Sequence, residues 1–200
     1  MRWLSLYARS RQVPGTAAAV SLVTLLVWAL VEPGPADPQT AALVLAAHVA
    51  AASVGLGGPD VTLERTAAIR WMRRRAAHVL VIGTVAGLAL LSVRTVGVEV
   101  APGAVVVRDS AGLVGLAALG AALFGAAFAW TLPTGWLALT VVVPTPGGTV
   151  GQVLKWMVFP PGTTTSAAVA WALFTTGTLV YLGLRLDQWG IAFSVAALWA

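Results

Sequence analysis

The feature that most constrains this fold is the length of its uncharged segments. No Asp, Glu, Lys or Arg occurs in residues 110–154, and shorter uncharged runs lie on both sides of that stretch. Only 10% of the 200 residues are charged and 58% are hydrophobic, whereas a soluble domain has about 25% charged residues. A hydrocarbon core of about 30 Å needs roughly 20 apolar residues per helix. The sequence therefore predicts an all-α, polytopic transmembrane helical bundle.

The predicted bundle is a single transmembrane domain over residues 1–200 with six spans. Pro133 and Pro144 divide the long uncharged region, and the segment that follows Pro133 is short, so five spans stay open as the alternative. Residues 94–109 are expected to form a polar loop with some strand character, and residues 144–163 a re-entrant or extracytoplasmic element. The predicted spans are residues 16–31, 39–56, 76–93, 110–132, 134–151 and 165–184.

Two segments near the N-terminus, residues 1–13 and 16–31, each allow two interpretations. Residues 1–13 carry three arginines and two aromatic rings, which is typical of an interfacial helix, although a frayed tail fits as well. Residues 16–31 also resemble the apolar part of a secretory signal. The run is long for a signal core and more spans follow it, so we expect an uncleaved helix.

A polar segment at residues 59–75 separates the second and third predicted spans. Asp60 is placed to cap a helix, and Glu64 lies in its first turn, where a negative charge complements the helix dipole. The arginines of this segment spread around a helical wheel rather than forming one stripe, which favours contact with a polar partner over surface-lying. The residues expected to make that contact are Asp60, Glu64, Arg65 and Arg70.

The basic residues predict the orientation. With six spans and a cytoplasmic N-terminus, nine basic residues lie inside and three outside, in agreement with the positive-inside rule. Five spans give the same ratio, because Lys155 and Arg185 exchange sides. Arg73, Arg74 and Arg75, directly before the third span, are the expected topology determinants. The Ala-, Val-, Gly- and Arg-rich, Lys-poor composition indicates a bacterial source, so the predicted location is the cytoplasmic membrane, as a multi-pass protein. The inside set is Arg2, Arg9, Arg11, Arg65, Arg70, Arg73, Arg74, Arg75 and Arg185; the outside set is Arg94, Arg108 and Lys155.

The sequence lacks the residues that several classes of chemistry require. There is no cysteine, no G-x-x-x-x-G-K-[ST] loop and no HExxH, so we expect neither an enzyme nor a metal or cofactor site in this chain. No acidic residue falls inside a predicted span, which disfavours a proton-coupled carrier. His48 and His78 are interpreted as packing residues. The net charge of +5 is assigned to topology and anionic lipid, and no nucleic-acid partner is expected.

Glycines mark the expected contacts between helices. Gly83 and Gly87 form a small-x-x-x-small pair, which lets two membrane helices approach closely. Gly115, Gly120 and Gly125 give the fourth predicted span a comparable small-residue face. We predict that these five glycines pack against neighbouring helices.

The order of these elements resembles the membrane (permease) subunit of a type-2 ABC exporter of the compact actinobacterial kind. Residues 1–13 stand where that family has an interfacial helix, and PDVTLERTAAIRWMRRRAA stands at the place of its cytoplasmic coupling helix. VPTPGGTVGQVLKWMVFPPGTTT stands where the family has re-entrant helices between spans five and six.

The resemblance implies a function and partners. Two permease subunits, identical or paralogous, would line a path through the lipid bilayer, and each would dock on a separate ABC ATPase subunit that carries ATP and Mg. Glu64, Arg65 and Arg70 would form the docking contact, with Asp60 at the start of the coupling helix. The alternative is a non-catalytic membrane scaffold or anchor subunit of a larger complex, which explains the glycine-rich spans equally well.

Overall fold

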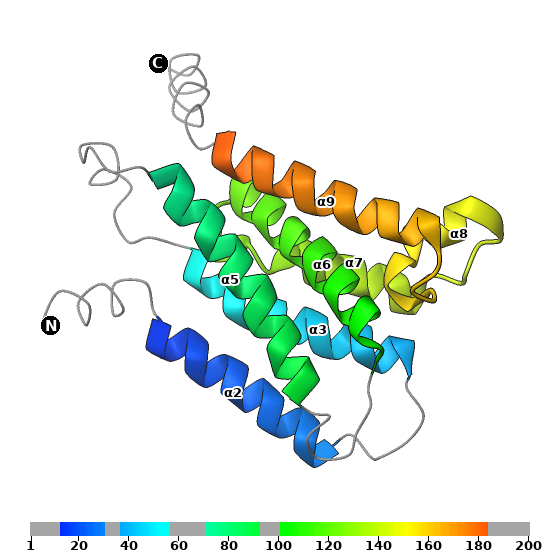
Figure 1. Cartoon of the computed structure of the whole chain (residues 1–200), viewed down its shortest axis with the longest axis horizontal. Coiled ribbons are helices and arrows are strands. Elements are labelled where there is room, and N and C mark those ends of the chain that lie inside the picture. Colours follow the sequence, from blue (N-terminus) through cyan, green and yellow to red (C-terminus); the bar gives the residue numbers. More distant parts are fainter. Residues whose placement is uncertain (1–12, 31–36, 57–70, 93–100, 184–200) are drawn as a thin grey trace, which may run out of the picture.

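The computed structural model describes residues 13–30, 37–56, 71–92 and 101–183 (Figure 1). Seven α-helices and three short 3-10 helices make up this part of the chain, and it contains no strand. The expectation of an all-helical chain is thus confirmed for the described residues. The α-helices are α2 (Val13–Leu30), α3 (Pro38–Ser53), α5 (Trp71–Ser92), α6 (Gly103–Phe124), α7 (Thr131–Val142), α8 (Gly148–Leu154) and α9 (Thr164–Gly183). The 3-10 helices are η1 (Val54–Leu56), η3 (Ala126–Phe128) and η4 (Trp156–Val158).

The long helices run alternately in opposite directions (Figure 1). α2, α5 and α7 run from the end of the bundle where the described chain begins, and α3, α6 and α9 run back towards it. α8 and η4 follow α7 at the opposite end, before the chain enters α9. α3 therefore ends, and α5 begins, at the end of the bundle where α2 starts and α9 finishes.

Helix α6 is the centre of the packing. It contacts α3, α5, α7 and α9, and its contact with α9 is the most extensive between any two described elements. Most of its residues are buried, whereas only a minority of the residues of α5 and α9 is buried. α3 is the second buried helix; its alanines let it lie close to α2, α5, α6 and α7.

The start of α3 is fixed by a side-chain cap. The carboxylate of Asp37 accepts hydrogen bonds from the Thr40 hydroxyl at 2.6 Å and from the backbone amides of Thr40 and Gln39. These bonds satisfy amides that the first turn of a helix leaves unpaired. The Thr40 hydroxyl and then its amide lower the pKa of Asp37 below its ordinary value. Pro38 follows at the first helical position, where the lack of an N–H costs nothing.

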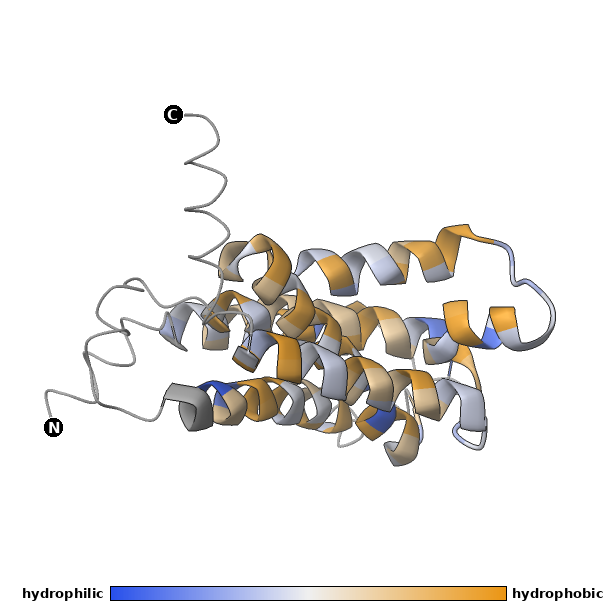
Figure 2. Ribbon diagram, turned by 90° about the horizontal axis from the view of Figure 1, so that it is seen from above, coloured by the Kyte–Doolittle hydropathy of each residue, from blue (hydrophilic) through white to orange (hydrophobic). Residues whose placement is uncertain are grey.

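The outer faces of the helices are apolar. Leu22, Leu25, Leu88 and Leu179 are each more than half exposed, and hydrophobic colours recur along the helices in Figure 2. Such extensive exposed apolar surface is unusual for a soluble monomer. Three described helices are long and apolar enough to cross a membrane: residues 75–92 of α5, α6 and α9. Residues 14–30 and 126–142 form shorter apolar helices, so the remaining predicted spans stay predictions.

Two predicted boundaries in the uncharged region were wrong. We expected one span to end at residue 132 and the next at residue 151, with Pro133 between them. In the structure α6 ends at Phe124, where Gly125 adopts φ +90°, a conformation that side chains disfavour. Pro133 is the third residue of α7, and proline is tolerated in the first turn of a helix. Residues 148–151 belong to α8 instead of the fifth predicted span.

The predicted loop at residues 94–109 was wrong in its second half. α6 begins at Gly103, directly after Pro102, so Val105, Val106 and Val107 are helical and not extended. Valine favours strands by its branched side chain, but packing in the bundle overrides this preference. The fourth span is thereby seven residues longer at its start than predicted, and it includes Arg108 and Asp109.

Two glycines set the contact between α6 and α9. A Cβ at Gly177 would clash with the backbone of Gly115, and a Cβ at Gly115 would clash with the backbone of Leu173 and Phe174. The helices therefore touch backbone to backbone, as small residues allow in membrane proteins.

We predict that Gly177→Ala destabilises the bundle. The added methyl group must separate α9 from α6, and overpacking of this kind costs about 1–3 kcal/mol. The apparent Tm of the purified protein in detergent should fall. Gly135→Ala is the matched control, because Gly135 lies inside α7 with open space around its Cβ position. That substitution should be neutral or stabilising, since alanine favours a helix over glycine by about 1 kcal/mol. Equal Tm values for both variants would contradict the close contact.

Candidate functional site

The first half of α6 carries a buried ion pair. Arg108 is 4% exposed and Asp109 is fully buried. The Arg108 Nε donates to Asp109 Oδ1 at 2.7 Å, although neighbouring residues on a helix do not normally face each other. A buried charge is very costly unless it is paired and hydrogen-bonded. Ionisable residues inside membrane helices are rare and mark functional positions, so this pair is the leading candidate site in the described chain.

The guanidinium of Arg108 also holds the segment that follows α8. Its two terminal nitrogens donate to the carbonyl oxygens of Pro160 at 3.1 Å and Met157 at 3.4 Å. Arginine suits this role because its five donors form a planar fork. We call this unit, formed by Arg108, Asp109, Met157 and Pro160, the clasp. It joins α6 to a segment about fifty residues further along the chain.

Trp156 completes the contact beside the clasp. Its side chain is fully buried, and a Cβ at Gly112 would clash with its six-membered ring. Gly112 lies one helical turn after Arg108, so the indole and the guanidinium meet the same face of α6. η4, which contains Trp156, also packs on α3 and α9. The clasp and the indole thus anchor the segment between α7 and α9 to the core.

Three buried polar atoms, one each in α6, η4 and the first turn of α9, have no partner among the described residues. They are Asp109 Oδ2, Trp156 Nε1 and Ser166 Oγ. Lys155, directly before Trp156, is also buried, with 7% exposure. A buried polar atom that lacks a hydrogen bond costs about 1–3 kcal/mol. The carboxylate of Asp109 therefore keeps one oxygen available for a further hydrogen bond or a proton.

His48 has a packing role in the described structure. His48 is fully buried in α3, and its Nδ1 donates to the Val44 carbonyl oxygen at 2.7 Å. With that proton on Nδ1, the neutral ring accepts at Nε2 from the Thr24 hydroxyl of α2 at 3.0 Å. His48 therefore joins α3 to α2. His78 is half-buried in α5. Among the described residues no three His, Cys, Asp or Glu side chains are grouped to hold a metal ion.

The predicted docking residues lie outside the described part of the chain. Asp60, Glu64, Arg65 and Arg70 belong to residues 57–70, and the interfacial helix predicted at residues 1–13 falls almost wholly within residues 1–12. The end of the predicted coupling segment, residues 71–75, forms the first turn of α5. Arg73, Arg74 and Arg75 therefore belong to the helix itself, where Arg75 is half-buried.

Four of the five predicted packing glycines lie at close contacts. Gly83 and Gly87 face α6, where their Cβ positions would be 3.3 Å from Val114 and from the Ser110 hydroxyl. Gly115 touches α9, and a Cβ at Gly120 would lie 3.0 Å from the Ala129 carbonyl oxygen. The prediction for Gly125 was wrong, because a Cβ there would meet no atom within 4 Å. Its positive φ ends α6 instead.

The clasp was not predicted, because residues 94–109 were expected to form a loop. Arg108 and Lys155 were therefore assigned to the outside of the membrane, and no acidic residue was assigned to a span. The Pro102–Gly103 pair was the available signal, since proline followed by an apolar run often starts a helix. Extending the helix upstream to that pair would have placed Asp109 within it. Nothing in the sequence indicated that Met157 and Pro160 would be its neighbours.

Comparison of the chain with protein-family models, with curated proteins and with solved structures gave no match. The functional argument therefore depends on the residues and contacts of this chain.

We predict that Asp109→Asn lowers stability more than removal of both charges. The single variant leaves Arg108 buried without a counter-charge, which costs about 3–5 kcal/mol. Arg108→Met combined with Asp109→Leu removes both charges, but the Met157 carbonyl loses the Arg108 donor and the Pro160 carbonyl keeps only the Thr163 amide. The apparent Tm in detergent should rank wild type above the double variant and the double variant above Asp109→Asn. Thr175→Ala, on the exposed face of α9, is the control and should match wild type. A wild-type Tm for Asp109→Asn would show that the pair is not buried in the native protein.

Proposed function

We propose that this chain is the membrane-spanning permease subunit of an ATP-driven ABC exporter in the bacterial cytoplasmic membrane. Two such subunits, identical or paralogous, would form the translocation path. Each would dock on a separate ATPase subunit that binds ATP and Mg. The arginine-rich residues 59–75 would be the coupling segment, in contact with that ATPase through Asp60, Glu64, Arg65 and Arg70.

The observation that carries this proposal is the end of the bundle at which α3 finishes and α5 begins. α3 ends and α5 begins at the end where α2 starts and α9 finishes (Figure 1). With the N-terminus in the cytoplasm, a segment joining α3 to α5 would be cytoplasmic, as docking on an ATPase requires. The high density of arginine in residues 65–75 supports the same side by the positive-inside rule.

A second observation, at the opposite end of the bundle, supports the proposal. Residues 143–163 return to α6 through the clasp and Trp156. An element that is folded back between α7 and α9 is consistent with six passes and a re-entrant element outside. Backbone of this kind persists at membrane depth only where protein covers it or a wet cavity lies beside it. Motion of nearly rigid helices about such a fixed element would couple the two ends.

Cysteine labelling tests the orientation and the number of spans, because the chain has no native cysteine. We predict that a membrane-impermeant maleimide labels Gly162→Cys on intact cells and labels Ala68→Cys only after permeabilisation. Gly162 is exposed, and nothing lies within 4 Å of its Cβ position. Labelling of Gly162→Cys only from the inside would indicate five spans. Labelling of Ala68→Cys on intact cells would reverse the orientation and exclude the exporter assignment.

A charge reversal tests the docking contact. We predict that the Glu64→Arg/Arg65→Glu variant inserts normally but loses the ATP hydrolysis that co-purifies with the tagged wild-type chain from its native membrane. Placing like charges opposite each other costs several kcal/mol, so the bound ATPase should fall at least about tenfold. Arg185→Glu/Asp187→Arg is the matched control, with the same charge changes on the same predicted side. Unchanged hydrolysis in the first variant would remove the docking contact. Co-purification of the wild type with a non-ATPase complex would favour a scaffold subunit.

A further inference from the structure

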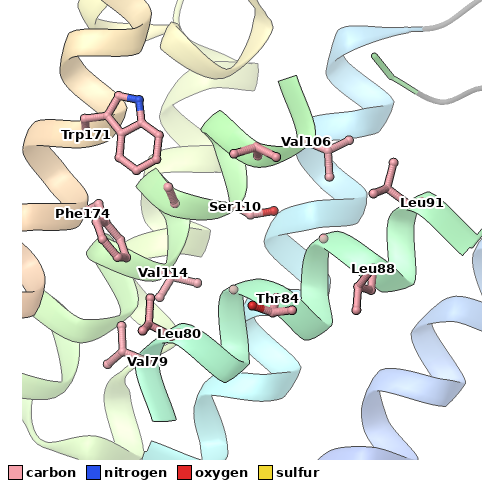
Figure 3. A pocket seen from close by; sticks show the side chains of 14 residues that line it. Val79, Leu80, Thr84, Leu88, Leu91, Val106, Ser110, Val114, Trp171 and Phe174 are labelled. Atoms are coloured by element: carbon pink, nitrogen blue, oxygen red, sulfur yellow. The ribbon is translucent and has the colours of Figure 1, made fainter. Parts of the chain in front are cut away.

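A groove of about 390 Å³ lies between α5, α6 and α9 on the outer surface of the bundle (Figure 3). Its floor is formed where α5 meets α6, by Gly83 and Gly87 against Ser110 and Val114. No charged side chain lines it. Ligand pockets typically have volumes of about 300–1,000 Å³, with apolar walls and a few polar groups that fix the orientation of the ligand. The groove meets each of these criteria.

The rim of the groove is apolar and exposed. Leu80, Leu88 and Val107 are each more than half exposed, and Trp171 of α9 is 48% exposed. Because these side chains surround the opening, a molecule reaches the floor from the apolar outer face of the bundle. In a bilayer that face meets lipid chains, so a ligand enters from the membrane and not from water.

Ser110 places one polar group on the floor. The residue is 5% exposed, and its Oγ has no hydrogen-bond partner among the residues that the structure describes. Figure 3 shows its oxygen directed from α6 towards α5. Serine in membrane helices normally bonds to a carbonyl of the preceding turn or to a neighbouring helix. A buried hydroxyl without such a bond gains from a ligand that supplies one.

We infer that the groove binds a single-chain amphiphile whose one hydrogen-bonding group, a hydroxyl or a carbonyl, pairs with the Ser110 hydroxyl. The alkyl chain lies between the rim residues, and the absence of charged lining residues excludes an ionic headgroup from the floor. Ser110 is seven residues into α6, so the pairing lies about 10 Å along the helix from its start. This inference goes beyond the proposed exporter function and does not require ATPase docking.

A helix from a second copy fits the groove less well than a chain-like ligand. A helix is about 10–12 Å wide with its side chains, and its backbone groups are bonded internally. It would therefore cover the rim and leave the Ser110 hydroxyl unpaired unless a polar side chain stood opposite. A hydroxyl or carbonyl on a flexible chain is narrower than a helix and fits between the rim side chains above the floor. The unpaired hydroxyl thus favours an amphiphile over a second copy.

Photolabelling of the full-length protein in lipid nanodiscs tests the inference. The probe is a long-chain alcohol that carries a diazirine, with dodecanol and dodecane as competitors. We expect labelling concentrated within residues 79–91 and 106–114, and stronger competition by dodecanol, by about twofold to tenfold. Ser110→Ala should abolish the difference between dodecanol and dodecane while labelling itself persists. Labelling spread over all apolar outer faces, or an unchanged preference in Ser110→Ala, would overturn the inference.

A pair of rim variants keeps the test independent of the buried serine. Leu80→Trp places a larger side chain in the groove and should reduce labelling severalfold. Val81→Trp is the matched control, because Val81 is the next residue of α5, is equally exposed and does not line the groove. Equal labelling of both variants would contradict binding in the groove. Photo-cross-links between two copies at residues 79–91 in place of probe labelling would assign the groove to an interface between copies of this chain.

Discussion

The direct contact of α6 with α9 at Gly115 and Gly177 is the constraint on which the rest of the described structure depends. In lipid, apolar side chains gain little from burial against one another, so close packing and hydrogen bonds hold the helices together. Because Gly115 and Gly177 have no side chain, the two backbones touch and α9 lies directly against the central helix. The chain between α7 and α9 must then return to α6 before α9 begins, which brings Trp156 over Gly112.

The clasp fixes residues 157–160 against α6. A guanidinium in a medium of low dielectric constant needs a counter-charge and several acceptors. Asp109 supplies the charge, and the carbonyls of Met157 and Pro160 supply acceptors that no helix uses. Loss of either acidic or basic partner leaves a buried charge, so the two residues act as one unit. The net contribution of such a pair to stability is smaller than the cost of breaking it by removing one partner.

The sequence predicted that helices are present, but it did not predict their bounds in the uncharged region or their contacts with distant segments. Long apolar runs identified the helical segments, and the small-residue spacing placed Gly83, Gly87, Gly115 and Gly120 at close contacts, because both signals are local. The start of α6 was predicted seven residues too late, because two adjacent charged residues, Arg108 and Asp109, are typical of a loop. Their burial depends on carbonyls about fifty residues away, and no local pattern encodes such a partner. The free hydroxyl of Ser110 was likewise visible only once α5 lay beside α6.

Two faces of α6 form the two sites: one face contacts the segment held by the clasp, and the other lines the groove. Arg108, Gly112 and Gly115 follow the helical spacing of one face, which meets η4, its adjoining loop and α9. Val107, Ser110 and Val114 follow that of another face, which lines the groove. Because a helix moves as a nearly rigid body, a rotation of α6 that opened or closed the groove would also change the geometry at Arg108. Gly115 lies on the same face as Arg108, so such a rotation would also disturb its backbone contact with Gly177.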